Sequence, residues 1–155
     1  MTADGAPEVA DRPGGAAVTV NHVGLCVTDL DRSRRFYEGA LGFAFDRSLQ
    51  PPDAVCATLL GIEPPVGLTA VYLTRGAFTL ELLHFDRPGN PPARERAMPE
   101  PGLTHLSVNT DDLEAALARV AAHGGEVLTA THVGVAVMVR DPDGQLLELI
   151  QPPGG

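Results

Sequence analysis

Apolar and polar residues alternate along several short segments of the chain, and in two places the apolar residues recur at helical spacing instead. Alternation with a period of two predicts strands, whereas steps of three and four predict amphipathic helices. The helices are expected between residues 28 and 42 and between residues 111 and 125, each with a polar N-cap and a glycine at its end. Strands are expected at residues 20–27, 43–49, 68–74, 77–85, 103–110, 126–131, 133–140 and 145–150.

The two halves of the chain repeat one another. VNHVGLCVTDL at residues 20–30 is echoed by LTHLSVNTDDL at residues 103–113, and TLELL, which contains Glu81, is echoed by LLELI, which contains Glu148. Each half reads as strand, helix and three strands. We therefore expect an α+β fold of two paired βαβββ modules, whose strands form a curved mixed sheet. A chain of 155 residues fits one domain with one shared core.

The expected modules span residues 18–86 and 103–152. Residues 1–17 are acidic and rich in Ala, Gly and Pro, a composition typical of a disordered tail. Residues 87–102 are polar and rich in proline, which predicts a linker. Residues 53–67 have no counterpart in the second half; they can form a helical turn, and such an insertion is compatible with a lid or with a subunit contact.

Four side chains occupy equivalent positions in the repeat: His22, Glu81, His105 and Glu148. His22 alternates with Val23, Leu25 and Val27, whose strand face is better suited to pack on a helix, so the histidine is expected to point away from the packed helix. A carboxylate in a strand as apolar as that of Glu81 is costly to bury unless a cation meets it. Imidazole and carboxylate together suit Zn, Ni, Co, Mn or Fe(II). The four residues are therefore candidate ligands of one divalent ion, and the other interpretation is hydrogen-bonded core histidines with solvent-facing glutamates.

The composition argues against several classes of function. A net charge of -9 without a basic stripe disfavours nucleic acid and anionic membranes, so a small molecule is the expected partner. All 11 basic residues are arginine, so no lysine can form a Schiff base, and no serine lies in a GxSxG motif. No apolar segment approaches the ~20 residues of a membrane span. Cys26 and Cys56 have no CxxC spacing, which favours a reduced, cytoplasmic protein.

The motifs as a set resemble the vicinal oxygen chelate superfamily, the fold of glyoxalases, bleomycin resistance proteins and extradiol dioxygenases. The resemblance covers residues 20–152 and rests on HVGLCVTDLDRSRRFYEGALGF, FTLELLHF, THLSVNTDDLEAALARVAAHGG and VRDPDGQLLELIQ. It implies βαβββ modules around a central metal site, with one divalent ion held by His22, Glu81, His105 and Glu148. It also implies a homodimer, in a superfamily whose modules pair within one chain or across chains.

The resemblance implies a metal-dependent isomerase or lyase, closest in motif to methylmalonyl-CoA epimerase-like and glyoxalase-like members. The substrate would present two adjacent oxygens to the ion, and Glu148, or else Glu81, would remove and return a proton beside a metal-stabilised enolate. Glutathione-dependent members have an arginine and an asparagine where this chain has Cys26 and Phe85, which argues against glutathione. Two alternatives remain open: an Fe(II) extradiol-type dioxygenase, and a resistance protein that sequesters a small molecule.

The three arginines of the first expected helix, Arg32, Arg34 and Arg35, are interpreted as its solvated face.

Overall fold

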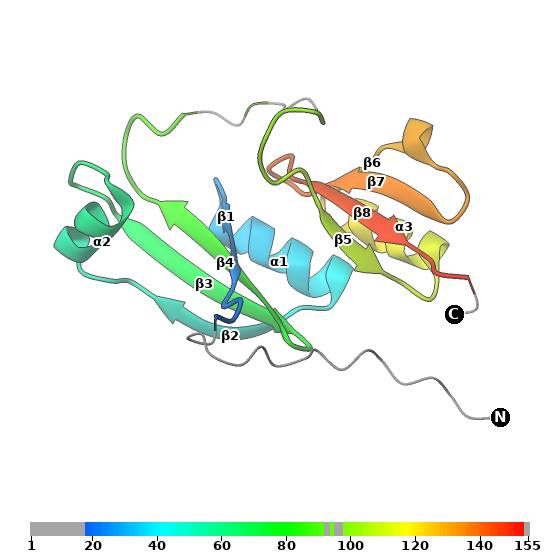
Figure 1. Cartoon of the computed structure of the whole chain (residues 1–155), viewed down its shortest axis with the longest axis horizontal. Coiled ribbons are helices and arrows are strands. Elements are labelled where there is room, and N and C mark those ends of the chain that lie inside the picture. Colours follow the sequence, from blue (N-terminus) through cyan, green and yellow to red (C-terminus); the bar gives the residue numbers. More distant parts are fainter. Residues whose placement is uncertain (1–17, 92–93, 95–97, 154–155) are drawn as a thin grey trace.

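The structure is a computed structural model that describes residues 18–91, 94 and 98–153. Two four-stranded sheets follow one another along the chain, and each is packed against a helix of its own module (Figure 1). The α+β fold of two βαβββ modules is thus confirmed. The expected tail, residues 1–17, lies outside the described residues, as does part of the expected linker.

The first module has the strand order β1-β4-β3-β2, in which β1 is parallel to β4 and the other neighbours are antiparallel. Its elements are β1 (Val23–Cys26), α1 (Leu30–Leu41), β2 (Ala44–Leu49), α2 (Asp53–Leu60), β3 (Leu68–Arg75) and β4 (Phe78–Phe85). Asp29 caps α1 by accepting the Arg32 amide at 2.9 Å. Gly42, at a φ of 69°, ends the helix in the left-handed conformation that glycine adopts without strain.

The second module repeats this order as β5-β8-β7-β6. Its elements are β5 (Leu106–Asn109), α3 (Leu113–Ala122), β6 (Glu126–Val127), the short 3-10 helix η1 (Thr129–Thr131), β7 (Ala136–Arg140) and β8 (Leu146–Ile150). The prediction of a strand over residues 126–131 is wrong beyond Val127. There the Thr131 hydroxyl donates to the Leu128 carbonyl at 2.7 Å and accepts the Met138 amide at 2.9 Å, which stabilises a turn instead.

The inserted segment forms α2 and a loop that returns to β3. Asp53, the first residue of α2, accepts the amides of Val66 and Gly67, both at 2.9 Å. One carboxylate therefore joins the start of the helix to the end of the loop. On α2 itself Cys56 is buried, whereas Leu59 is 80% exposed.

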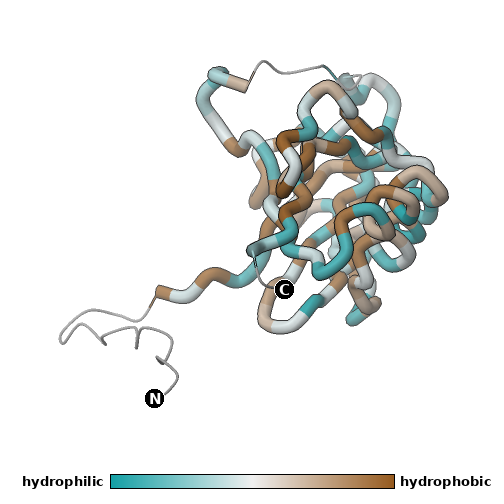
Figure 2. Tube along the Cα trace, turned by 90° about the vertical axis from the view of Figure 1, so that its right-hand side faces the viewer, coloured by the Kyte–Doolittle hydropathy of each residue, from teal (hydrophilic) through white to brown (hydrophobic). Residues whose placement is uncertain are grey.

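The helix-facing sides of both sheets share one hydrophobic core, to which α1 contributes Phe36 and α3 contributes Val120. The two helices pack closely because Gly39 of α1 has no side chain: a Cβ there would lie 2.1 Å from His123 Nε2. In Figure 1 both helices lie behind the sheets, so the helix-free faces of the two sheets point to the same side. Figure 2 shows hydrophobic and hydrophilic positions alternating along the folded part of the chain. In the described ranges no helix is long and apolar enough to cross a membrane.

Candidate metal centre

The first histidine and glutamate of the repeat lie side by side on the helix-free face of the first sheet. His22 immediately precedes β1, and β1 pairs with β4 so that Gly24 is opposite Glu81. His22 Nε2 is 3.0 Å from Glu81 Oε2, and the Glu81 side chain is only 11% exposed. The partner that a nearly buried carboxylate requires is therefore His22.

The orientation of His22 is set through its other ring nitrogen. His22 Nδ1 is 2.7 Å from Asn21 Oδ1. One ring nitrogen thus lies against an amide oxygen, and the other, Nε2, faces the carboxylate. The Tyr72 ring stands edge-on to the imidazole, with 5.6 Å between ring centroids. Burial, followed by hydrogen bonding to Glu81 and the charge of Glu81, raises the pKa of Tyr72, so its hydroxyl keeps its proton beside the carboxylate.

The second pair has the same arrangement, with a more exposed glutamate. His105 Nε2 is 3.5 Å from Glu148 Oε2, and the two side chains are 31% and 29% exposed. His105 Nδ1 is 2.9 Å from Thr104 Oγ1, in the position that Asn21 has beside His22. Ser107 Oγ donates to Glu148 Oε2 at 2.9 Å. The second carboxylate is thus held by a hydroxyl from the neighbouring strand as well as by its histidine.

The structure brings the four predicted ligands together as two pairs and not as one group. Among residues 18–91, 94 and 98–153, no cluster of three or more His, Cys, Asp or Glu side chains could hold a metal ion. The outer strand β1 and the chain entering β5 line a cavity of about 350 Å³, which includes His105. Of the four predicted ligands, His105 is the one that lines this cavity between the modules.

Cys26 also lines this cavity. Burial, and then the negative charge of Asp143, raises the pKa of the Cys26 thiol. A raised pKa favours the protonated thiol over the nucleophilic thiolate. This agrees with an incidental cysteine and not with a catalytic one.

The donor set of each pair fits a borderline divalent ion. Each pair offers one imidazole nitrogen and one carboxylate oxygen, no more than 3.5 Å apart. Each imidazole also contacts an oxygen through its second nitrogen, as metal-binding histidines generally do. Imidazole with carboxylate suits Zn, Ni, Co, Mn or Fe(II). The chemistry of the predicted ligands is therefore right for the ion, with the four ligands divided between two sheets.

A row of side chains crosses the first sheet beside its pair. Arg47 on β2 is opposite Tyr72 on β3, Tyr72 is opposite Glu81 on β4, and Glu81 is opposite Gly24 on β1. Directly opposed residues point to the same face of a sheet. The Arg47 guanidinium carbon accordingly lies 4.0 Å from the centroid of the Tyr72 ring.

Neither Tyr72 nor Arg47 is among the residues that the sequence analysis singles out. The position of Tyr72 could have been predicted, because a hairpin with its turn at Arg75-Gly76 brings Tyr72 opposite Glu81. The position of Arg47 could not, because it depends on a register shift between Phe45 and Arg47.

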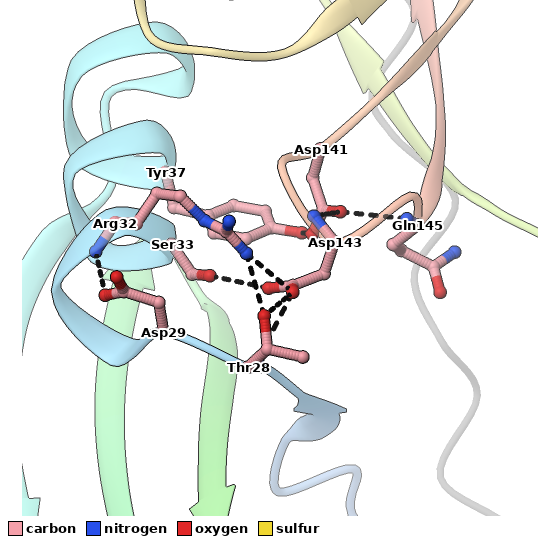
Figure 3. A network of polar contacts seen from close by, with 8 residues as sticks. All are labelled: Thr28, Asp29, Arg32, Ser33, Tyr37, Asp141, Asp143 and Gln145. Carbon is pink, nitrogen blue, oxygen red and sulfur yellow. Dashed lines mark hydrogen bonds and ion pairs between the residues drawn. The ribbon is translucent and has the colours of Figure 1, made fainter. Parts of the chain in front are cut away.

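A polar network joins the start of α1 to the DPDG turn between β7 and β8 (Figure 3). Asp143 accepts from Arg32 Nη2 at 2.7 Å and from Ser33 Oγ at 2.9 Å, and the Thr28 hydroxyl also donates to it. The interpretation of Arg32 as part of a solvated face is therefore wrong: it forms an ion pair with the other module. The network holds the first module against the second.

Tyr37 and Asp141 form the buried part of the same joint. The Tyr37 hydroxyl donates to Asp141 Oδ2 at 2.8 Å, and the amides of Asp143 and Gln145 donate to Asp141 Oδ1 at 2.9 and 2.8 Å. Burial raises the pKa of Asp141, although these hydrogen bonds oppose the shift. The pKa of Tyr37 lies well above its ordinary value, because of burial and the neighbouring carboxylate.

A family model of the Glyoxalase/Bleomycin resistance protein/Dioxygenase superfamily matches residues 19–149. The chain belongs to this superfamily. The matched range contains both histidine–glutamate pairs and the DPDG turn, so the resemblance inferred from the sequence motifs is confirmed.

Individual relatives agree with this assignment. The lactoylglutathione lyase of Haemophilus influenzae is 28% identical over 136 residues, which cover 84% of this chain and 90% of that protein. The uncharacterized protein YaeR of Escherichia coli is 28% identical over 137 residues, which cover 85% of this chain and 95% of that protein. A glyoxalase family protein from Bacillus cereus superposes with a TM-score of 0.78 at 16% identity, covering 91% of this chain and 98% of its own. At that identity the likeness shows the fold alone.

Proposed function

We propose that the protein is a divalent-metal-dependent isomerase or lyase that acts on a small molecule with two adjacent oxygens. The observation that carries this proposal is the pair of equivalent contacts, His22 Nε2 to Glu81 at 3.0 Å and His105 Nε2 to Glu148 at 3.5 Å, on helix-free sheet faces. Four such ligands leave room on a six-coordinate ion for two oxygens of a substrate. The similarity to a lactoylglutathione lyase supports the same reaction class.

A divalent ion that brought the two pairs together would polarise a substrate carbonyl and stabilise the enolate formed when a proton leaves the adjacent carbon. The histidines are suited to hold it, since each presents Nε2 while its Nδ1 contacts a neighbouring oxygen. Glu81 suits a fixed ligand because it is nearly buried and lies against both His22 and Tyr72.

Glu148 is the better candidate for the group that removes and returns the proton. Its side chain is 29% exposed, against 11% for Glu81, and it lies farther from its histidine. A general base must reach the carbon from which it takes the proton, and a less enclosed carboxylate does so with less rearrangement. Ser107 orients the same carboxylate by donating to its Oε2.

The substrate proposed here is not a glutathione adduct, although the relative from Haemophilus influenzae is named for one. The positions that carry an arginine and an asparagine in glutathione-dependent members are Cys26 and Phe85 in this chain. Neither side chain can form the ion pair or the amide hydrogen bonds of those residues.

Elemental analysis of the purified protein tests the metal site, using wild type, His105→Ala and His84→Ala. His84 is the matched control. It lies on β4 three residues from Glu81, so it points to the other face of the sheet, and it is opposite Thr69. We expect about one divalent ion per chain in wild type and in His84→Ala, and a loss of metal in His105→Ala. Metal retained in His105→Ala, or no uptake by wild type, would overturn the proposal and leave a small-molecule binding protein on the same fold.

The reaction class is tested separately by proton exchange. Incubating the metal-loaded protein with a panel of α-hydroxy ketones and methylmalonyl thioesters in D₂O should replace the hydrogen next to the carbonyl, as followed by NMR. Oxygen consumption on catechols with bound iron would instead favour a dioxygenase.

A further inference from the structure

The row Arg47–Tyr72–Glu81–Gly24 places a cation on the same sheet face as the first half of the candidate metal centre. Arg47 lies 4.0 Å from the Tyr72 ring, and that ring lies 5.6 Å from the His22 ring. The guanidinium and the imidazole therefore both lie against the Tyr72 ring. A small molecule bound at His22 and Glu81 can reach Arg47.

A β-bulge puts this arginine on the site face. Phe45 is opposite Leu73, and Arg47 is opposite Tyr72, so Asp46 is the extra residue of the bulge. In a regular strand Asp46 would be opposite Tyr72 and Arg47 would face the core side, because successive residues alternate between faces. The bulge thus replaces a negative side chain with a positive one at the end of the row.

Arg47 has an ion-pair partner that a ligand can displace. It pairs with Asp46, its neighbour in the chain, and the two side chains remain 51% and 40% exposed. Exposed ion pairs of this kind contribute little to stability. The planar guanidinium fork binds carboxylates in a bidentate manner, and stacking on Tyr72 holds its plane in place. In a chain with a net charge of -9, this local cation is what an anionic ligand needs.

The equivalent row of the second sheet has no such charge. Glu148 is opposite Met138, and the Leu128 amide donates to the Met138 carbonyl at 3.0 Å, so the row continues through apolar residues. The two rows therefore differ, with a cation beyond Tyr72 and apolar residues beyond Glu148. Arg140, which lies two residues from Met138 on the same strand face, is held by Glu126 at 3.7 Å and by the Gly144 carbonyl at 3.3 Å.

From this asymmetry we infer that the substrate carries a carboxylate in addition to its two metal-binding oxygens, and that Arg47 binds this carboxylate. The inference rests on the proposed function and specifies its substrate class: an anionic small molecule with its charged end over the first sheet. Arg47 is thus a specificity-determining residue for that substrate.

Two hydroxamates that share a chelating group test the inference by calorimetric titration of the metal-loaded protein. Succinic acid monohydroxamate carries a carboxylate at its far end, and butyrohydroxamate ends in a methyl group. We expect wild type to bind the carboxylate probe more tightly than the neutral one. Arg47→Gln should weaken binding of the carboxylate probe by about tenfold or more and change the affinity for the neutral probe by less than about twofold.

Arg34→Gln is the matched control, because Arg34 also lies over an aromatic ring, 4.3 Å from the centroid of Phe45, but it comes from α1. It should leave both affinities unchanged. Asp46→Asn offers a second test in the opposite direction: removing the competing carboxylate should tighten binding of the carboxylate probe alone.

The outcomes separate the two proposals. If the neutral hydroxamate binds and Arg47→Gln affects both probes equally or neither, the role of Arg47 is wrong and the metal site stands. If wild type binds the two probes equally, the inferred carboxylate is wrong. If neither hydroxamate binds the metal-loaded protein, the proposed function fails and this inference fails with it.

Discussion

The two modules carry the same histidine and glutamate at equivalent positions, but the surroundings of the two pairs differ. In the first module Glu81 is nearly buried, 3.0 Å from His22, and its row continues through Tyr72 to Arg47. In the second module Glu148 is partly exposed, 3.5 Å from its histidine, and its row continues through Met138. The repeat thus preserves the ligands and changes their neighbours.

This difference teaches how a repeated module can serve a reaction that is not symmetric. Two identical halves would offer a substrate two equivalent carboxylates and two equivalent ends. Burial and contacts distinguish the carboxylates. A ligand that holds the ion must stay in place, whereas a group that transfers a proton must be able to reach the substrate.

The largest effect is expected from exchanging each glutamate for glutamine. Glu148→Gln should retain the metal and lower proton exchange by about 10² to 10⁴-fold, the usual contribution of a general base. Glu81→Gln should instead reduce the metal content, because it weakens a ligand that holds the ion. Metal analysis and deuterium exchange on the same samples distinguish the two results.

The reverse pattern, with metal lost in Glu148→Gln and exchange abolished in metal-loaded Glu81→Gln, would exchange the two roles. Equal behaviour of the two variants would mean that burial and contacts do not separate the carboxylates.

The next largest effect is expected from the way the two histidine–glutamate pairs combine in a dimer. The superfamily resemblance implies a homodimer, and a dimer can build each site within one chain or from two. Because the helix-free faces of both sheets point to the same side of one chain, we expect the site to form within a chain. Co-expressed and doubly tagged His22→Ala and His105→Ala chains should then bind no more metal than either variant alone.

Recovery of about half of the wild-type metal in the mixed dimer would place the site between chains, because one of its two sites would then be free of substitutions. His22→Ala mixed with Glu81→Gln is the control. Both changes lie in the first module, so that mixture should remain without metal in either arrangement.

The smallest effect is expected at the joint between the modules. Tyr37→Phe removes the hydrogen bond to Asp141 Oδ2 and should lower the free energy of unfolding by about 1–3 kcal/mol at neutral pH. That hydrogen bond lowers the pKa of Asp141, so it favours the ionised carboxylate. Its contribution is therefore present above the pKa of Asp141 and is lost as the pH falls through it, a range that burial moves above the ordinary 3.8.

Urea unfolding of wild type and Tyr37→Phe near neutral pH and at about pH 4 measures this difference. A gap between the two proteins that is the same at both pH values would show that the hydroxyl acts through packing and not through the charge of Asp141.

Local pattern and repetition predict much of this molecule. The alternation of residues predicts that His22 lies on the sheet face without the helix. The apolar strand around Glu81 predicts that this carboxylate has a partner, and that partner is His22. The caps Asp29 and Asp112 and the end of α1 at Gly42 follow from short-range preferences of the backbone. These features depend on residues close together in the chain or on the comparison of one half with the other.

The rest depends on contacts that no local pattern encodes. Arg32 resembles a solvated helix residue until the DPDG turn, 111 residues away, brings Asp143 against it. The separation of the candidate ligands into two pairs depends on how the modules sit together, and the repeat does not fix that. The bulge at Asp46 is equally hidden, since the polar residues around it fit either register.

The bulge lies in β2, at one edge of its sheet, whereas the candidate metal ligands of that module lie at the opposite edge, His22 just before β1 and Glu81 on β4. Inserting or deleting one residue in β2 would therefore exchange the side chain presented beyond Tyr72 and leave the ligand strands in register. Descendants of such a chain could acquire a new preference for charged or neutral substrates in a single mutational step, with the ion-binding chemistry inherited unchanged.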